Sequence, residues 1–236
     1  MTNLKAELKN LTNPDKAKIL AKFFKTAKGQ YGEGDIFLGI TVPEQRKLAK
    51  KYKEISLKEI KELLKENIHE YRLTALLILV QKYETLDIEK KKEIFNFYLD
   101  NVLYINNWDL VDLTAPKIIG NYLLLFKEQR QILYNYAKSE NLWQRRISIV
   151  STYTFIKNQE YDNTLEIAKI LLNDKHDLIH KAVGWMLREV GKKQEYLLKD
   201  FLNIYYKQMP RTMLRYAIEK FDKETRQHYL FKAPML

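Results

Sequence analysis

The chain has 236 residues, of which 46% are hydrophobic and 30% are charged, so it can bury a sizeable core and is not a disordered protein. It carries 41 Lys and Arg against 30 Asp and Glu, a formal net charge of +11. This surplus favours polyanionic partners, nucleic acid before a membrane surface, although a lysine-rich solvated surface would give the same total.

Two absences narrow the classes of protein further. The chain has no cysteine, which excludes disulfides, thiolate nucleophiles and zinc fingers. No apolar run approaches the roughly 18 residues of a membrane span, and the first five residues lack the apolar stretch of a signal peptide. We therefore expect a cytoplasmic protein that does not bind membranes.

The spacing of apolar residues predicts an all-α protein. Only seven glycines and five prolines interrupt the chain, and apolar residues recur three and four positions apart almost everywhere. The first clear helix start is Asn13-Pro14-Asp15, and the pattern predicts a helix that continues to Lys28 and ends at Gly29. The residues expected on its buried side are Ile19, Leu20 and one of Phe23 and Phe24.

The segment Gln30–Ile40, with Gly29 before it, holds four of the seven glycines and is predicted to be a loop. A glycine-rich loop can hold a phosphate, but this one matches neither a P-loop nor a strand-led dinucleotide motif. The sequence therefore favours a packing loop. After it, Thr41, Pro43 and Glu44 predict a helix with a capping box that runs towards Tyr52.

From there the helices repeat. When similar segments are aligned, Arg72, Asp109, Arg145, Lys181 and Arg215 fall at one register position, and their spacings are 37, 36, 36 and 34 residues. Such a period, filled by two helices each, is typical of HEAT-like repeats. We expect residues 1–236 to form one domain, a right-handed solenoid of antiparallel helix pairs with a basic concave face. Alternatively, the repeated arginines cap helices between repeats, as in HEAT arrays that bind only proteins.

The run Asn106–Pro116 places an aromatic residue and a carboxylate four positions apart. If the run is helical, Trp108 and Asp112 share one face. A carboxylate in such an apolar segment needs a cationic partner or a solvent cleft, and Pro116 should interrupt the helix because it lacks the N–H that would bond the carbonyl of Asp112. Asp112 is then either a functional carboxylate or a structural one that caps a restarting helix or pairs with an arginine.

Other candidate sites are weaker. His176 and His180 stand four apart and could bind a metal, but neither cysteine nor an intervening glutamate supports this. Trp143, at a predicted helix start, is interpreted as structural. Trp185 follows Gly184, which would let a bulky neighbour approach, so its side chain is either core or functional.

Four motifs together resemble the AlkD-type DNA alkylation repair glycosylases over nearly the whole chain. They are Phe37-Leu38-Gly39-Ile40 with Pro43, Glu44 and Arg46, then Trp108-Asp109-Leu110-Val111-Asp112, then Leu142-Trp143-Gln144-Arg145-Arg146, and Gly184-Trp185-Met186-Leu187-Arg188-Glu189. The match is looser in the first thirty residues and after about Tyr205.

The resemblance implies a HEAT-like solenoid that binds alkylated duplex DNA and hydrolyses the N-glycosidic bond of cationic purines, chiefly 3-methyladenine and 7-methylguanine. By position, Asp112 matches the catalytic carboxylate, Trp108 and Trp185 match the aromatic walls, and Arg146 matches the arginine beside them. Arg188 matches a position that contacts DNA, and the basic register adds Arg145 and Lys181 as DNA-binding candidates.

The chemistry of such a substrate agrees with a single acid. A purine alkylated at N3 or N7 is already positive and leaves as a neutral molecule, so no general acid is needed, unlike in two-carboxylate glycosidases. Asp112 would stabilise the oxocarbenium-like sugar or orient water. No lysine stands out as an amine nucleophile, which argues against a bifunctional lyase.

We therefore predict a monofunctional glycosylase without metal or organic cofactor, acting as a monomer on double-stranded DNA with no obligate protein partner. Two alternatives remain: a non-catalytic HEAT-repeat module that binds damaged or branched DNA, and a scaffold for protein partners.

Overall fold

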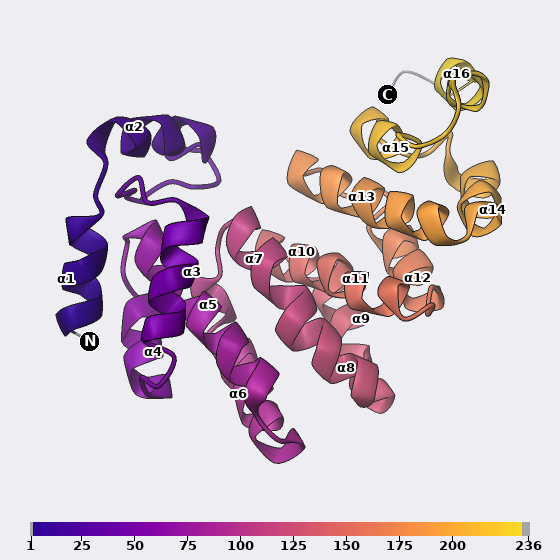
Figure 1. The fold of residues 1–236 in the computed structure, drawn as a ribbon. Helices are drawn as coiled ribbons and strands as arrows, with labels where there is room; N and C mark the ends of the chain where they lie inside the picture. Colours follow the sequence, from indigo (N-terminus) through magenta and orange to yellow (C-terminus); the bar gives the residue numbers. More distant parts are fainter. Residues whose placement is uncertain (1, 233–236) are drawn as a thin grey trace. The chain divides into compact units, whose positions relative to one another are not determined.

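The computed structural model describes residues 2–232 and shows the predicted all-α protein (Figure 1). Within these residues the only β-type pairing is an isolated bridge between Ile36 and Ile68. None of the helices between residues 2 and 232 combines the length and the apolar character needed to cross a membrane. The chain divides into two compact units, residues 1–114 and residues 115–236.

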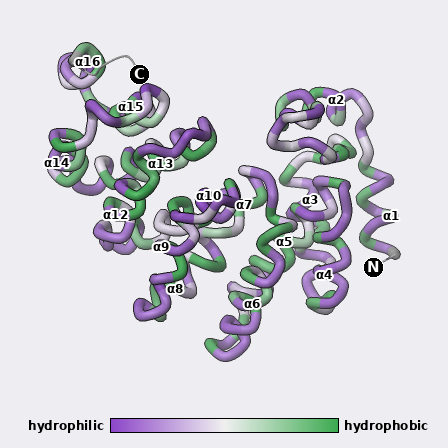
Figure 2. The backbone as a smooth tube through the Cα atoms, turned by 180° about the vertical axis from the view of Figure 1, so that it is seen from behind, coloured by the Kyte–Doolittle hydropathy of each residue, from purple (hydrophilic) through white to green (hydrophobic). Residues whose placement is uncertain are grey.

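The helices of the first unit pack around α5. Its elements are α1 Thr2–Asn10, α2 Pro14–Phe23, α3 Val42–Lys51, α4 Leu57–Leu64, α5 His69–Thr85, α6 Ile88–Asp100, a 3-10 turn Val102–Tyr104 and α7 Trp108–Ala115, whose last residue already belongs to the second unit. Helices α1, α3, α4 and α6 all contact α5. The middle of α5 is hydrophobic, green in Figure 2, and every residue from Leu73 to Val80 is buried.

The second unit is also helical. Its elements are a π-helical segment Pro116–Gly120, α8 Asn121–Leu125, a 3-10 turn Lys127–Gln129, α9 Gln131–Ala137, α10 Leu142–Ser151, α11 Tyr153–Lys157, α12 Asp162–Ile170, α13 Asp177–Lys193, α14 Glu195–Tyr205, α15 Arg211–Ala217 and α16 Lys223–Lys232. Helix α13 packs against α10, α11, α12, α14 and α15. A Cβ on Gly184 would lie 2.5 Å from the carbonyl oxygen of Met213, so this glycine lets α15 approach α13, as its position suggested.

The predicted repeat register is visible in the helices. Arg72, Asp109, Arg145, Lys181 and Arg215 lie in the first five residues of α5, α7, α10, α13 and α15 respectively. Three of these helices pack against the helix before them in the chain: α5 against α4, α10 against α9 and α13 against α12. The single-domain and solenoid expectations stay predictions.

Helix α2 is shorter than predicted. It begins as expected, with Pro14 at its first position and the Asn13 side chain accepting from the backbone N–H of Lys16. It ends at Phe23 rather than Lys28, because Lys25 takes a left-handed φ of 53°. The N–H of Thr26 then bonds the carbonyl of Ala21, a Schellman-type ending that the sequence did not reveal because glycine usually occupies this position.

The early end of α2 also changes which of its side chains are buried. Phe24 is turned into the core at 6% exposure, whereas Ile19 and Phe23 are 68% and 61% exposed. The expectation that Ile19 is buried was wrong, and of the two phenylalanines only the second is internal. Two apolar side chains of α2 therefore lie at the surface.

Candidate active site

The glycine-rich segment after α2 is a packing loop, as predicted, and its backbone binds a carboxylate of the protein itself. The N–H groups of Leu38, Gly39 and Ile40 donate to Glu70 Oε1 or Oε2 at 2.9, 2.8 and 3.2 Å. Gly39 has a φ of 83°, and a Cβ there would lie 2.2 Å from the carbonyl oxygen of Asn13. This loop is therefore fixed against the start of α2, and the three backbone N–H groups of Leu38, Gly39 and Ile40 are occupied by Glu70.

The predicted helix start after the loop is confirmed. Glu44 Oε2 accepts from the backbone N–H of Thr41 at 2.9 Å and from the Thr41 hydroxyl at 2.6 Å. Helix α3 then runs from Val42 to Lys51.

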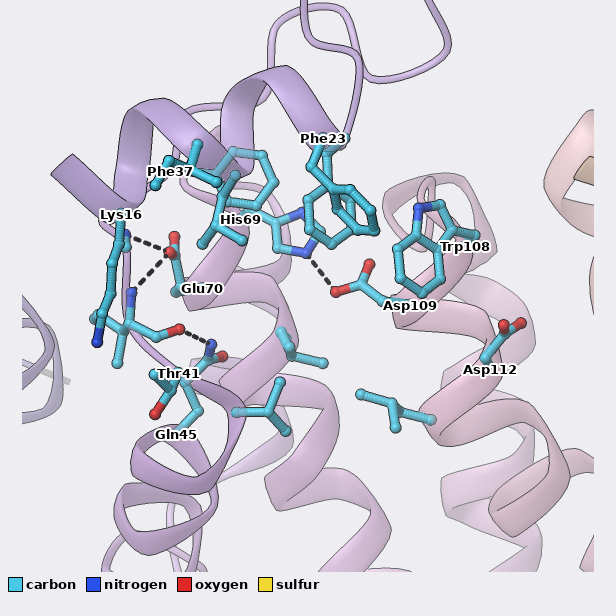
Figure 3. Close-up of a pocket in the computed structure, with 18 residues that line it drawn as sticks. Lys16, Phe23, Phe37, Thr41, Gln45, His69, Glu70, Trp108, Asp109 and Asp112 are labelled. Atoms are coloured by element: carbon cyan, nitrogen blue, oxygen red, sulfur yellow. Dashed lines mark hydrogen bonds and ion pairs between the residues drawn. The ribbon is translucent and has the colours of Figure 1, made fainter. Parts of the chain in front are cut away.

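Between α2, this loop and the helices α3, α5 and α7 lies a pocket of 420 Å³ within the first unit. Its walls are mostly apolar and include Leu20, Ile40 and Leu73, and Trp108 and Asp112 are also among its lining residues. The two residues predicted to share one helical face thus lie together on α7 at this pocket (Figure 3).

Trp108 is held by aromatic side chains from the end of α2. The ring of Phe24 stacks on the indole at a centroid distance of 5.0 Å and an interplanar angle of 7°, and the ring of Phe23 meets the indole edge-on at 5.9 Å. One face of the indole is therefore covered by the protein, and the indole is half-buried. A substrate that contacts this tryptophan has to use the other face or an edge.

Asp112 lies inside α7, so it does not cap a restarting helix, and that structural alternative was wrong. Its side chain is half-buried. Pro116 interrupts the helix as expected: α7 ends at Ala115, and the following five residues are π-helical. The carbonyl of Pro116 accepts from the Thr154 hydroxyl at 2.6 Å, which gives the irregular backbone a partner.

A second carboxylate on α7, Asp109, points the other way. Figure 3 shows it directed at His69, whereas Asp112 is directed away from that imidazole. The Nε2 of His69 donates to Asp109 Oδ2 at 2.8 Å, and its Nδ1 donates to Asp35 Oδ2 at 3.1 Å. Arg72 donates to the other oxygen of Asp35 at 2.7 Å. These four side chains form a buried ion cluster, with exposures between 2% and 9%.

The cluster shifts two pKa values. Burial opposes the charged form of His69, but the Asp109 and Asp35 carboxylates outweigh it and raise the pKa of His69 to about 9. Burial also acts on Asp35, yet hydrogen bonds from His69 and Arg72 together with their charges leave its pKa lowered. At neutral pH the cluster therefore contains an imidazolium and an ionised Asp35.

Sequence reasoning missed most of this cluster. Asp35 and His69 lie 34 residues apart, and His69 and Asp109 lie 40 apart, so no local pattern joins them. The available signal was that Asp109 is the only acidic residue in a basic register, which suggests a cationic partner. Arg72, from the same register, is 5% exposed and does not contribute to a basic surface.

The remaining predicted site residues lie in the second unit. Trp185, on α13, is half-buried, and its ring lies 5.8 Å from that of Tyr153. Arg146 is 5% exposed, and its Nη1 donates to the carbonyl of Leu178 at 2.5 Å. Trp143 is 8% exposed, which confirms that it is a core residue.

Three basic side chains predicted to contact DNA form ion pairs within this unit. Arg145 Nε donates to Asp174 at 2.6 Å, Lys181 pairs with Asp177 at 2.7 Å, and Arg188 pairs with Glu219 and Glu189. Arg145 also donates to the carbonyls of Ser139 and Glu140, so it ties α10 to the neighbouring loops. Their contacts with DNA stay predictions.

The two histidines considered as metal ligands make local bonds instead. His176 caps α13 by accepting from the N–H of Leu178 at 3.1 Å, and His180 Nε2 donates to the carbonyl of Asp174 at 2.5 Å. In the part of the chain that the structure describes, no group of three His, Cys, Asp or Glu side chains is placed to hold a metal ion.

The structure is thus that of an all-α protein in which a tryptophan and a carboxylate of one helix lie at an apolar pocket, a candidate active site. Comparison gives the family: residues 4–221 match the model of the DNA alkylation repair enzyme family. The chain belongs to this family.

Solved structures support the fold. A predicted DNA alkylation repair enzyme from Enterococcus faecalis superposes with a TM-score of 0.71 at 19% identity, over 90% of this chain and 97% of the other. AlkD2 from Streptococcus mutans gives 0.56 at 20% identity, over 88% and 97%. The protein smu.31 from Streptococcus mutans UA159 gives 0.56 at 21% identity, over 77% and 93%. No curated protein matches the chain.

Proposed function

We propose that this protein is a monofunctional DNA glycosylase that releases positively charged alkylated purines, chiefly 3-methyladenine and 7-methylguanine, from duplex DNA in base excision repair. The observation that carries the proposal is the pair Trp108 and Asp112, which lie on one helix at an apolar pocket of 420 Å³. Family membership supplies the class of substrate, alkylated DNA.

Asp112 is the catalytic carboxylate in this proposal. The alkylated base carries its own positive charge, so it leaves without being protonated, and the charge then moves onto the sugar. A carboxylate about 4 Å from that sugar, at an effective dielectric constant near 20, contributes about 4 kcal/mol of attraction. This corresponds to about a thousandfold in rate. The same carboxylate can orient the water that attacks the sugar.

Trp108 contributes selectivity. Its electron-rich face attracts a cation by about 0.5 to 2 kcal/mol, so a charged base is favoured over a neutral one. Phe24 covers one face of the indole, which leaves the opposite face for the lesion or the sugar. The stack keeps the indole plane fixed, so no ordering is required when the substrate arrives.

The second unit supplies the remaining roles by its match to the family motifs. Trp185 forms the other aromatic wall, and Arg146 holds the phosphate beside the lesion. Arg145, Lys181 and Arg188 contact the DNA backbone. The enzyme acts as a monomer and requires neither a metal nor an organic cofactor.

Base release from a duplex oligonucleotide that contains one 7-methylguanine tests the proposal, measured under single-turnover conditions by chromatography of the free base. Asp112→Asn should lower the rate by about a thousandfold. The matched control is Asp100→Asn, at the exposed end of α6, which should leave the rate unchanged. Release by Asp112→Asn at the wild-type rate would remove Asp112 from the mechanism.

The same samples separate the alternatives. A wild-type protein that binds the duplex in a salt-sensitive way but releases no base would be a non-catalytic DNA-binding relative. Neither binding nor release would indicate a scaffold for proteins. A covalent adduct trapped with borohydride would identify a lyase rather than a monofunctional enzyme.

A further inference from the structure

Four rings of the first unit, the ring stack, join His69 to Trp108, and Phe24 contacts both end rings, with its centroid 5.1 Å from that of the imidazole and 5.0 Å from that of the indole. The imidazole of His69 stacks on Phe37 at 4.5 Å and 22°, Phe37 stacks on Phe24 at 4.9 Å and 26°, and Phe24 stacks on Trp108 at 5.0 Å and 7°. The rings come from α5, the packing loop, the end of α2 and α7. The outer ring of this stack is the indole assigned to the substrate.

The geometry of His69 requires its charged form. Each of its ring nitrogens lies within 3.1 Å of a carboxylate oxygen, which can only accept when ionised. A neutral imidazole has only one N–H. Its other nitrogen would then direct a lone pair at a carboxylate oxygen, and the lone pairs of the two atoms would repel each other. An imidazolium donates to both.

The charges around His69 balance only in this state. Asp35 faces it from the packing loop, Asp109 from α7 and Arg72 from its own helix α5. Two carboxylates are then matched by one guanidinium and one imidazolium. Loss of the imidazolium proton would leave a net negative charge in a site where the side chains are at most 9% exposed, which is costly.

The cluster also reaches the backbone at the start of α7. Asn107 donates through Nδ2 to Asp35 at 3.1 Å and accepts through Oδ1 from the backbone N–H of Trp108 at 2.8 Å. Asp109 accepts through Oδ1 from the N–H of Leu110 at 2.9 Å. The first turn of α7 is therefore anchored to the same group of charges.

We infer that His69 is a positioning residue for the candidate active site: its imidazolium fixes the first turn of α7 through Asp109 and fixes the Trp108 indole through the ring stack. Asp112, one turn further along α7, is placed by the same anchor. The inference rests on the proposed function for its catalytic consequence, and we assign His69 a positioning role and not a catalytic one because its side chain is only 2% exposed and both ring nitrogens are held by carboxylates of the protein.

The coupling between His69 and Trp108 can be tested in the wild-type protein without DNA. Indole ¹⁵N signals of the three tryptophans, assigned with single Trp→Phe variants, are followed by NMR from pH 6 to 10 together with the His69 imidazole. We expect the Trp108 signal to move with the same midpoint as His69, near pH 9. The signals of Trp143 and Trp185 should not move at that midpoint, because neither ring belongs to the stack. A Trp108 signal that ignores the titration of His69 overturns the inference.

The catalytic consequence is tested with His69→Gln, and His228→Gln, at an exposed position, serves as the control. We expect single-turnover base release by His69→Gln to fall about 10- to 100-fold, as for other outer residues that orient a catalytic group, while the dissociation constant for the duplex changes less than about threefold. The wild-type rate should decline above pH 8 with a midpoint near 9, after subtraction of uncatalysed base loss. The variant should have a low rate without that decline.

These experiments distinguish a failure of the positioning role of His69 from a failure of the proposed glycosylase function. A wild-type protein that releases no base refutes the proposed function, and the NMR titration alone then decides whether His69 positions Trp108. If base release occurs and His69→Gln keeps the wild-type rate, the positioning role is refuted while the glycosylase stands. If His69→Gln does not fold, the wild-type pH profile and the NMR titration carry the test.

Discussion

Replacing His69 with glutamine should remove a pH dependence of stability that the buried ion cluster imposes. The pKa of His69 is raised from 6.5 to about 9 in the folded protein. Since the folded state binds this proton more tightly, the added stability is fully present below pH 6.5 and is lost as the pH rises through about 9. Each tenfold change in proton affinity is about 1.4 kcal/mol, so the total is about 3 kcal/mol.

The pKa of Asp35 does not disturb this window. It is lowered, so the stability that it contributes is present above its unfolded value and is lost only as the pH falls into the acid range. Between pH 6.5 and 9 the Asp35 carboxylate is ionised in both states. His69 therefore dominates the contribution of the cluster in that range.

Urea unfolding at several pH values between 6 and 9.5 measures the effect. The free energy of unfolding of the wild type should fall over this range by about 3 kcal/mol more than that of His69→Gln. The comparison between proteins removes the titrations of lysines and tyrosines that both share. His228→Gln, at an exposed site, should behave as the wild type. Parallel curves for the wild type and His69→Gln would refute the reasoning, because no stabilising charge would then be lost with the imidazole.

Three further experiments test other parts of the structure. Gly39→Ala should destabilise the protein by about 3 kcal/mol or more in urea unfolding, because the added Cβ would lie 2.2 Å from a backbone oxygen and the residue would also be strained by its positive φ. Gly29→Ala is the control: Gly29 has a φ of 78° but open space around it, so this variant should lose only about 1 kcal/mol. Lys181→Ala should reduce the slope of log affinity for duplex DNA against log salt by about 0.9, and an unchanged slope would remove this lysine from the phosphate contacts. Trp185→Ala should slow base release about tenfold at saturating protein, while Trp143→Phe should alter stability alone; equal effects on the rate would contradict the assignment of an aromatic wall.

The parts of the fold that the sequence predicted are those governed by local interactions. The helix start at Asn13, the capping box at Thr41 and the interruption at Pro116 each depend on residues a few positions apart. The predicted end of α2 was wrong for a related reason. The sequence marks helix ends most clearly by glycine, and here a lysine, Lys25, takes the left-handed conformation while Phe24 gains burial in the ring stack.

The sequence predicted the more exposed residues of the candidate site but not the buried residues that hold them in place. Trp108 and Asp112 were recognised because their spacing on one helix is visible in the sequence. Their supports, His69 and Asp35, come from α5 and from a loop, and a single sequence contains no information on which distant acid meets which imidazole. The basic register was also ambiguous, since Arg72 and Arg145 satisfy the same pattern yet form ion pairs within their own units.

The two carboxylates of α7, Asp109 and Asp112, have different proposed roles, and this difference affects how variants at the site should be interpreted. Asp109 is 7% exposed and accepts from His69, whereas Asp112 is half-buried at the pocket. Loss of either acid should slow base release, so loss of activity alone does not identify the catalytic one. Removal of Asp109 leaves the buried Nε2–H of the His69 imidazolium without its carboxylate and should lower stability with activity, because losing one partner of a buried ion pair is destabilising. Removal of Asp112 acts on the transition state, so it should lower the rate by far more than any change in stability accounts for. The catalytic carboxylate is therefore the one whose removal lowers the rate of base release by more than the loss of folding stability accounts for.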